Sequence, residues 1–203
     1  KQEVMITNLF LKAKHWHLFL LSFVLPFGVQ FILMGVMMSS MLSQSNPDPS
    51  FITGYFKFFP FIFFLFVVVL WGWIWSMAVG LQSKVPPHVK MKVTKFQVFF
   101  IIPVVYIFLF LFFITTSVNG LASSGTEPSV GVFGAIFALV VPLHLFSMFC
   151  IFYTLYFAAK TVKTVELQRE VTFSDFAGEF FLIWFYPVGV WIIQPKVNKM
   201  IEG

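Results

Sequence analysis

The sequence has 203 residues, of which 59% are hydrophobic and only 10% are charged, and its mean hydropathy is +0.92. A soluble domain of this size could not bury so much apolar surface, so the composition indicates an integral membrane protein. The net charge of +5 does not favour nucleic acid as a partner, because the basic residues lie in short stretches between apolar runs, where membrane-orientation rules account for them. The partner that we expect first is the lipid bilayer.

Four apolar stretches are each long enough to cross a bilayer, for which an α-helix needs about 20 residues. They cover residues 16–42, 58–81, 96–118 and 132–159. We therefore predict an all-α fold in which residues 1–171 form a four-helix transmembrane domain. The first stretch follows Lys12 and Lys14 and could be read as a signal peptide. It is too long for one and lacks a small-x-small cleavage site, so we expect a permanent helix.

Prolines interrupt three of the four stretches, at Pro26, Pro103 and Pro142. A proline lacks the backbone N–H that a helix needs and clashes with the carbonyl four residues earlier, so each is expected to kink its helix. Kinks of this kind can be hinges around a cavity. Since prolines are common in transmembrane helices, we interpret these three as structural bends.

The basic residues predict the orientation of the four stretches. The connection between the second and third stretches contains no acidic residue and four lysines, Lys84, Lys90, Lys92 and Lys95. Lysines also precede the first stretch and follow the fourth, so positive-inside counting places both termini in the cytoplasm. The four lysines could also attract anionic lipid headgroups, at about 1 kcal/mol each. The host that we expect is a bacterial plasma membrane.

One ionisable side chain, His144, lies deep inside an apolar stretch, about 18 Å from the outer end of its helix. Gln30 lies at a similar depth in the first stretch and is its expected hydrogen-bond partner. Intramembrane polar groups are functional hypotheses by default, because their desolvation is costly. The plainer interpretation is that the pair ties two helices together by about 0.6 to 2 kcal/mol. The alternative is a proton-binding switch or a substrate contact in a polar cavity.

Residues 172–203 form a tail on the cytoplasmic side that is too apolar for solvent. Thr172 and Asp175 have the spacing of a capping box, which predicts a new helix whose Asp175 and Glu179 form a solvated face. The apolar part, residues 180–193, is shorter than a normal span, so we expect an interfacial or re-entrant segment, with a fifth crossing as the alternative. The tail also offers apolar side chains for docking, namely Phe173, Phe176, Phe180, Trp184 and Trp191.

Residues 19–30 and 181–194 share an apolar run, a Pro-x-Gly-Val tetrapeptide and a following glutamine. A true repeat would hint at the internal symmetry of transporters. In a chain so rich in Phe, Leu and Val, we interpret the match as chance.

No enzyme signature occurs in the sequence, which lacks an HExxH motif, a G-x-S-x-G motif, a Gly-rich phosphate loop and a cluster of His and carboxylates at metal spacing. We therefore expect no catalytic residue, no cofactor and no metal. The leading hypothesis is a multi-pass protein that acts by interaction, as an accessory or assembly subunit of a membrane complex. Its partner would be another membrane protein or a second copy. The alternative is a small transporter or channel with Gln30 and His144 as its polar site.

Overall fold

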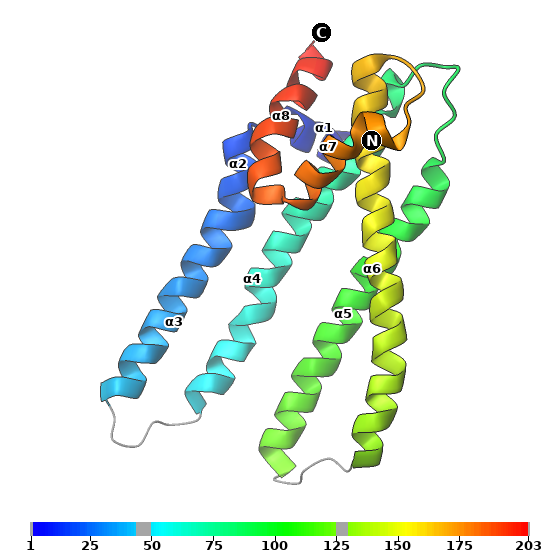
Figure 1. Cartoon of the computed structure of the whole chain (residues 1–203). Helices are drawn as coiled ribbons and strands as arrows, with labels where there is room; N and C mark the ends of the chain where they lie inside the picture. Colours follow the sequence, from blue (N-terminus) through cyan, green and yellow to red (C-terminus); the bar gives the residue numbers. More distant parts are fainter. Residues whose placement is uncertain (1, 44–49, 125–129, 203) are drawn as a thin grey trace. The chain divides into compact units, whose positions relative to one another are not determined.

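The computed structural model describes residues 2–43, 50–124 and 130–202, and every regular element in these ranges is a helix (Figure 1). This confirms the all-α prediction for the described part of the chain. In chain order the elements are α1 (Gln2–Lys12), α2 (His15–Phe19), the π-helical turn η1 (Leu20–Val24), α3 (Leu25–Ser43), α4 (Ser50–Trp75), the π-helical turn η2 (Ser76–Gly80), the 3-10 turn η3 (Leu81–Lys84), α5 (Val93–Ser124), α6 (Val130–Leu167), α7 (Phe173–Trp184) and α8 (Tyr186–Glu202).

Among the described residues, four helical segments are long and apolar enough to cross a membrane, which agrees with the predicted number of such helices. They are His15–Ser43, Ile62–Lys84, Val93–Ser117 and Phe137–Leu167. Each of them exposes large apolar side chains, for example Phe31, Val68, Leu109 and Leu145. Exposed apolar surface of this extent is stable only against lipid or against another apolar surface. The four segments therefore have the character of membrane spans.

The chain divides into two compact units. The first contains residues 1–91 and 158–203, and the second contains residues 92–157. Residues 172–203, the predicted tail, belong to the same unit as α1 to α4.

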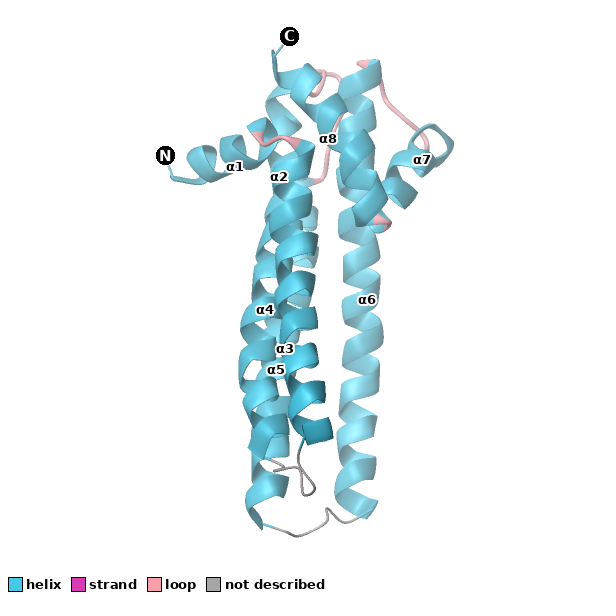
Figure 2. Cartoon of the chain, turned by 90° about the vertical axis from the view of Figure 1, so that its left-hand side faces the viewer, coloured by secondary structure: helices cyan, strands magenta, loops and turns pink. Residues whose placement is uncertain are grey.

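The first unit contains a helix, α1, that was not predicted from the sequence. It packs against the end of the second span at two glycines, where a larger residue would collide with it. A Cβ atom at Gly72 would contact the ring of Phe10, and one at Gly80 would overlap the side chains of Thr7 and Leu11. Figure 2 shows α1 extending sideways from α2, at the start of the first span.

Two π-helical turns interrupt the spans of the first unit. The turn η1 comes directly before Pro26, whose missing N–H leaves the Ser22 carbonyl without its usual helical donor. The π-helical turn lies close to Pro26, and the kink predicted there stays a prediction. Pro103 and Pro142 lie inside α5 and α6, which continue past them, and kinks at these two prolines stay predictions.

The second unit contains α5 and the first part of α6, which run antiparallel. Aromatic rings bridge them, with ring centroids 4.9 Å apart for Phe96 and Phe157 and also 4.9 Å apart for Phe99 and Tyr153. Ring pairs in stacked or tilted geometry contribute about 0.5–1.5 kcal/mol each beyond their apolar burial. These pairs therefore help to set the register of the two helices.

Candidate functional site

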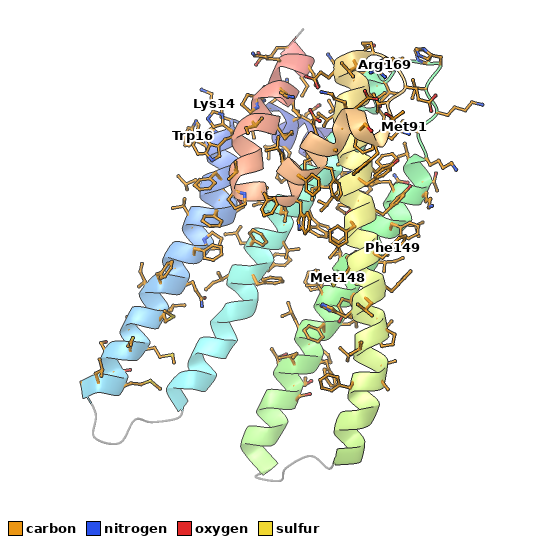
Figure 3. All side chains as sticks on the ribbon, in the orientation of Figure 1. Lys14, Trp16, Met91, Met148, Phe149 and Arg169 are labelled. Atoms are coloured by element: carbon orange, nitrogen blue, oxygen red, sulfur yellow. The ribbon has the colours of Figure 1, made fainter. Side chains whose placement is uncertain are left out.

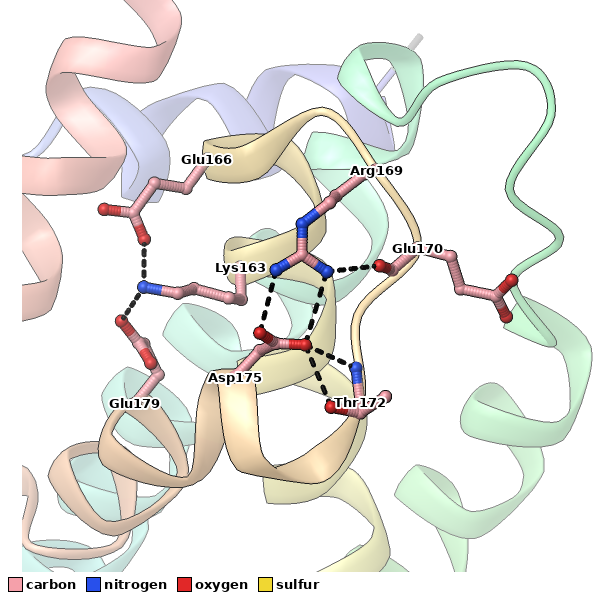
Figure 4. Close-up of polar contacts among 7 residues, drawn as sticks. All are labelled: Lys163, Glu166, Arg169, Glu170, Thr172, Asp175 and Glu179. Carbon is pink, nitrogen blue, oxygen red and sulfur yellow. Dashed lines mark hydrogen bonds and ion pairs between the residues drawn. The ribbon is translucent and has the colours of Figure 1, made fainter.

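The tail folds into a hairpin of two helices, α7 and α8, and the start of α7 carries the predicted capping box (Figure 4). The backbone N–H of Thr172 donates to the Asp175 carboxylate at 2.8 Å, and the Thr172 hydroxyl donates to the same group at 3.0 Å. The Arg169 guanidinium also lies 2.9 Å from this carboxylate. The Asp175 carboxylate thus accepts a hydrogen bond from the backbone N–H at the start of α7. Through Arg169 it also joins α7 to the segment that follows α6.

Acid is expected to weaken this cap. The Arg169 guanidinium, followed by the two Thr172 hydrogen bonds, lowers the pKa of Asp175 from 3.8 to about 2. A carboxyl with a depressed pKa in the folded state stabilises the fold above its unfolded pKa, and this contribution is lost as the pH falls through the folded value. Wild-type protein should therefore lose stability between about pH 4 and about pH 2.

Thermal unfolding in detergent at several pH values will test this, with Asp175→Asn as the comparison. The difference in melting temperature between wild type and Asp175→Asn should be constant above about pH 4 and should shrink towards pH 2. A difference that is independent of pH would show that the ionised carboxylate does not stabilise α7.

The turn between α7 and α8 is tight. The backbone N–H of Phe185 donates to the Phe181 carbonyl at 2.8 Å, which ends α7. A Cβ atom at Gly189 would overlap the carbonyl group of Leu182, so only glycine allows α8 to approach α7 this closely. The close approach fixes the direction in which α8 leaves the turn.

A buried glutamine on α8 connects three elements of the first unit. The indole N–H of Trp73 donates to Gln194 Oε1 at 2.7 Å. Gln194 Nε2 in turn donates to three backbone carbonyls at the end of α1, those of Phe10 (3.1 Å), Leu11 (3.1 Å) and Ala13 (2.8 Å). The last carbonyls of a helix lack partners inside it, so Gln194 serves as a C-cap supplied by a distant helix. We call this arrangement the Gln194 clamp.

The turn of the hairpin is held by a second polar contact, at Tyr186. This side chain is buried, its hydroxyl lies 2.7 Å from the Ser22 hydroxyl, and its ring centroid lies 5.2 Å from that of Trp73. The Ser22 hydroxyl also lies 2.6 Å from the Leu18 carbonyl of its own helix. A buried hydroxyl is costly unless it is hydrogen-bonded, so this contact fixes the start of α8 against the first span.

Four charged residues form a closed ring of ion pairs on α6, α7 and α8, and Figure 4 shows three of them, Lys163, Glu166 and Glu179. Lys163 lies 2.9 Å from Glu166 and 3.2 Å from Glu179, whereas Lys196 lies 3.5 Å from Glu166 and 3.1 Å from Glu179. Each carboxylate thus contacts both lysines. Burial alone would raise the pKa of Glu179, but hydrogen bonds from Lys196 and Lys163 outweigh it and the pKa is lowered. The ring therefore binds α7 and α8 to the end of α6.

The expectation of a solvated face at Asp175 and Glu179 is wrong for Glu179. Its side chain is only 7% exposed, because α6 and α8 cover this face of α7 and supply two lysines to neutralise the carboxylate. Asp175 is partly exposed but is paired with Arg169.

The expected docking residues divide into three groups. Phe173, Trp184 and Trp191 are exposed, Phe180 is half-buried, and Phe176 is fully buried. The interpretation of Phe176 as a docking residue is therefore corrected: it belongs to the core of the unit. The turn of the hairpin exposes further apolar side chains, which together with Trp184 we call the hairpin tip: Phe181, Trp184, Phe185 and Val188.

His144 has a polar partner in the second unit. The Tyr106 hydroxyl and His144 Nδ1 are hydrogen-bonded at 3.0 Å, and the imidazole is exposed. Tyr106 was not predicted from the sequence. It could have been found as a tyrosine at the same depth as His144 on the preceding apolar stretch, which runs antiparallel.

Gln30 lies in the first unit and lines a pocket of about 260 Å³ between α3 and α4, whose other lining residues are Pro26, Phe27, Ile62, Phe63 and Phe66. Its Oε1 atom is buried and has no hydrogen-bond partner among the described residues. Gln30 and His144 belong to different units, so their predicted contact stays a prediction.

The four lysines of the connection after η2 have different surroundings. The Lys84 backbone carbonyl accepts a hydrogen bond from Gln168 at 3.2 Å. The Lys95 ammonium lies 4.9 Å from the ring centroid of Tyr153, close enough for a cation–π interaction. Lys90 and Lys92 are exposed. Contact of these lysines with lipid headgroups stays a prediction.

In the described ranges, no three His, Cys, Asp or Glu side chains gather in a way that could hold a metal ion. No protein-family model matches the chain, and neither a curated protein nor a solved structure matches it. The hairpin, the Gln194 clamp and the ion-pair ring are thus the features from which a function can be argued.

Proposed function

We propose that this chain is a multi-pass membrane protein that acts by interaction, as an accessory or assembly subunit of a membrane complex, and that its hairpin tip docks on a partner within the bilayer. The observation that carries the proposal is the combination of a rigidly held hairpin with exposed aromatic side chains at its turn. A site that recognises a partner gains affinity when it is held in its binding geometry before the encounter.

The depth of the hairpin supports a re-entrant arrangement. Ser22, which contacts Tyr186 at the turn, lies about 10 Å into the span that begins at His15, at about 1.5 Å per residue. Halfway along α8, the Gln194 clamp holds Ala13, which precedes this span. In this arrangement the turn of the hairpin lies within the membrane. Lys196 and Lys199, further along α8, lie at the membrane surface.

The charges of the first unit support the proposed orientation. Lys14, next to Trp16 at the start of the first span, and Arg169 lie at the same end of this unit (Figure 3). Lys84 and Lys199 belong to the same unit. By the positive-inside rule this end faces the cytoplasm, with both termini on that side, and a bacterial plasma membrane is the proposed host.

The hairpin tip is suited to a membrane-embedded partner. Trp184 and Phe185 are 48% and 61% exposed, and aromatic residues of this size dominate the energetics of many interfaces. Lipid alone could cover these apolar side chains, but it would not require the hairpin to be held in a fixed orientation. We therefore propose a docking role rather than a simple anchor, and no catalytic role.

Affinity purification of the tagged protein from native membranes in a mild detergent will test this proposal. Wild type should retain a stoichiometric membrane partner, and the double variant Trp184→Ala with Phe185→Ala should retain at least about tenfold less of it. The matched control is Phe108→Ala with Phe112→Ala, which removes exposed rings from α5 and should keep the partner.

Two results would contradict the docking role. One is a wild-type protein that is reproducibly a lone monomer in several mild detergents, which would favour the transport alternative at Gln30 and His144. The other is equal retention of the partner by the hairpin variant and the control.

A further inference from the structure

A second cavity of the first unit lies beneath α1, and it has a volume of about 570 Å³. This is within the size range of sites that hold small ligands, about 300–1,000 Å³. Its lining residues come from α1, from the start of the first span and from the second span. The chemical character of its wall is set by six residues: Asn8, Lys12, His17, Leu18, Leu21 and Val69.

The wall of this cavity is polar at one end and apolar at the other. Lys12 and His17 lie on either side of the start of the first span at His15, at the level of the membrane surface, and Asn8 is one turn earlier on α1. Leu18 and Leu21 follow deeper along the first span, and Val69 lies in the second span. A molecule that fills this cavity therefore has a polar end at the surface and an apolar end in the membrane.

The polar end is suited to an anion. Lys12 supplies an ammonium, His17 an imidazole and Asn8 an amide, and all three can donate hydrogen bonds. Lys12 makes no ion pair with a described residue, and no acidic residue lines this cavity. Glu202 lies with Lys12 at a neighbouring pocket, but the two side chains form no ion pair. The Lys12 ammonium can therefore pair with a ligand of opposite charge in the cavity.

We propose that this cavity binds one anionic phospholipid, with its phosphate at Lys12 and His17 and an acyl chain between Leu21 and Val69. The charge complementarity and the order of polar and apolar residues along the membrane normal identify a phospholipid rather than a soluble anion, which would leave the apolar end empty. Phosphatidylglycerol is a suitable probe, because it differs from phosphatidylcholine in its net negative charge.

The cavity is an open groove whose inner wall belongs to the core of the first unit. Lys12, His17 and Leu21 are exposed along it, whereas Leu18 is buried. Phe10, which also lines the cavity, is seated against Gly72, where a Cβ atom would contact its ring. The Gln194 clamp holds the end of α1 that carries Lys12. The position of the cation is therefore set by the fold.

Lipid retention will test the proposal. The full-length protein is placed in nanodiscs of phosphatidylcholine with a minority of phosphatidylglycerol, extracted in mild detergent, and the retained lipids are identified by mass spectrometry. Wild type should retain phosphatidylglycerol in preference to phosphatidylcholine. Lys12→Gln should reduce this retention about fivefold, the effect of one lysine near the membrane surface.

Two matched controls separate the site from general effects. Lys14→Gln removes the same charge two residues away, outside the cavity, and should retain phosphatidylglycerol as wild type does. Leu21→Trp fills the apolar end and should abolish retention, whereas Leu20→Trp, at an equally exposed neighbour that does not line the cavity, should not.

The proposal is overturned if Lys12→Gln and Lys14→Gln retain equal amounts of phosphatidylglycerol, or if wild type retains the two lipids without preference. Equal retention by Leu21→Trp and Leu20→Trp would also overturn it. These outcomes are independent of whether the hairpin tip binds a partner, because none of the substituted residues belongs to the hairpin.

Discussion

Gly189→Ala is expected to disrupt the hairpin of α7 and α8 and to destabilise the protein by about 3 kcal/mol or more. Overpacking costs typically about 1–3 kcal/mol where neighbouring side chains can move. Here the new methyl group overlaps the backbone carbonyl of Leu182, which cannot yield without moving α7 itself. For a chain of this length, about 3 kcal/mol corresponds to a fall in melting temperature of about 10 °C.

The matched control for this substitution is Gly178→Ala on α7. A Cβ atom at Gly178 meets nothing within 4 Å, and alanine is a better helix former than glycine by about 0.5–1 kcal/mol. Gly178→Ala should therefore be neutral or slightly stabilising. Thermal unfolding gives the size of both effects, and hydrogen exchange shows whether protection is lost in α8 while that of α5 is kept. Equal effects of the two substitutions would show that α8 does not approach α7 as described.

Gln194→Leu is expected to have an effect of similar size for a different reason. Leucine fills nearly the same volume but removes the acceptor of the Trp73 indole and the donor to the carbonyls of Phe10, Leu11 and Ala13. A buried polar group left without a partner costs about 1–3 kcal/mol. Asn198 also donates to two of these carbonyls and will retain part of the cap. We expect a loss of about 3 kcal/mol, concentrated in α1 and α8.

Lys199→Leu serves as the control for Gln194→Leu, since it makes a polar-to-leucine change at an exposed position of the same helix. It should change the melting temperature little. The fluorescence of Trp73 adds a local measurement, but five other tryptophans contribute, so hydrogen exchange of α1 is the clearer test. Full protection of α1 in Gln194→Leu would mean that the clamp is not what holds this helix.

The four apolar helices and the capping box could be predicted because their signals are local. Hydropathy over about 20 residues identifies a helix that can cross a membrane, and the spacing of Thr172 and Asp175 identifies the start of α7. Both predictions are confirmed by the structure.

The Gln194 clamp could not be predicted because its partners are distant in sequence. Trp73 is 121 residues from Gln194, and the carbonyl of Ala13 is 181 residues away. The available signal was chemical, since a glutamine in an apolar segment is costly unless its amide is satisfied. Gln194 and Gly189 are also parts of the match with residues 19–30 that was interpreted as chance.

Glu179 illustrates a different limit of sequence reasoning. Its spacing from Asp175 correctly places the two carboxylates on one side of α7, but helical periodicity does not say what covers that side. The cover consists of Lys163 and Lys196, which reach Glu179 from two other helices.

The Gln194 clamp also has a consequence for biogenesis. Residues 10–13 leave the ribosome long before Gln194 and Asn198 are synthesised, so the end of α1 lacks its cap while the four apolar helical segments are being made. Only after α8 has emerged can α1 and α8 be joined. A nascent chain that stalls before this point carries backbone carbonyls at the end of α1 that lack their hydrogen bonds from Gln194 and Asn198.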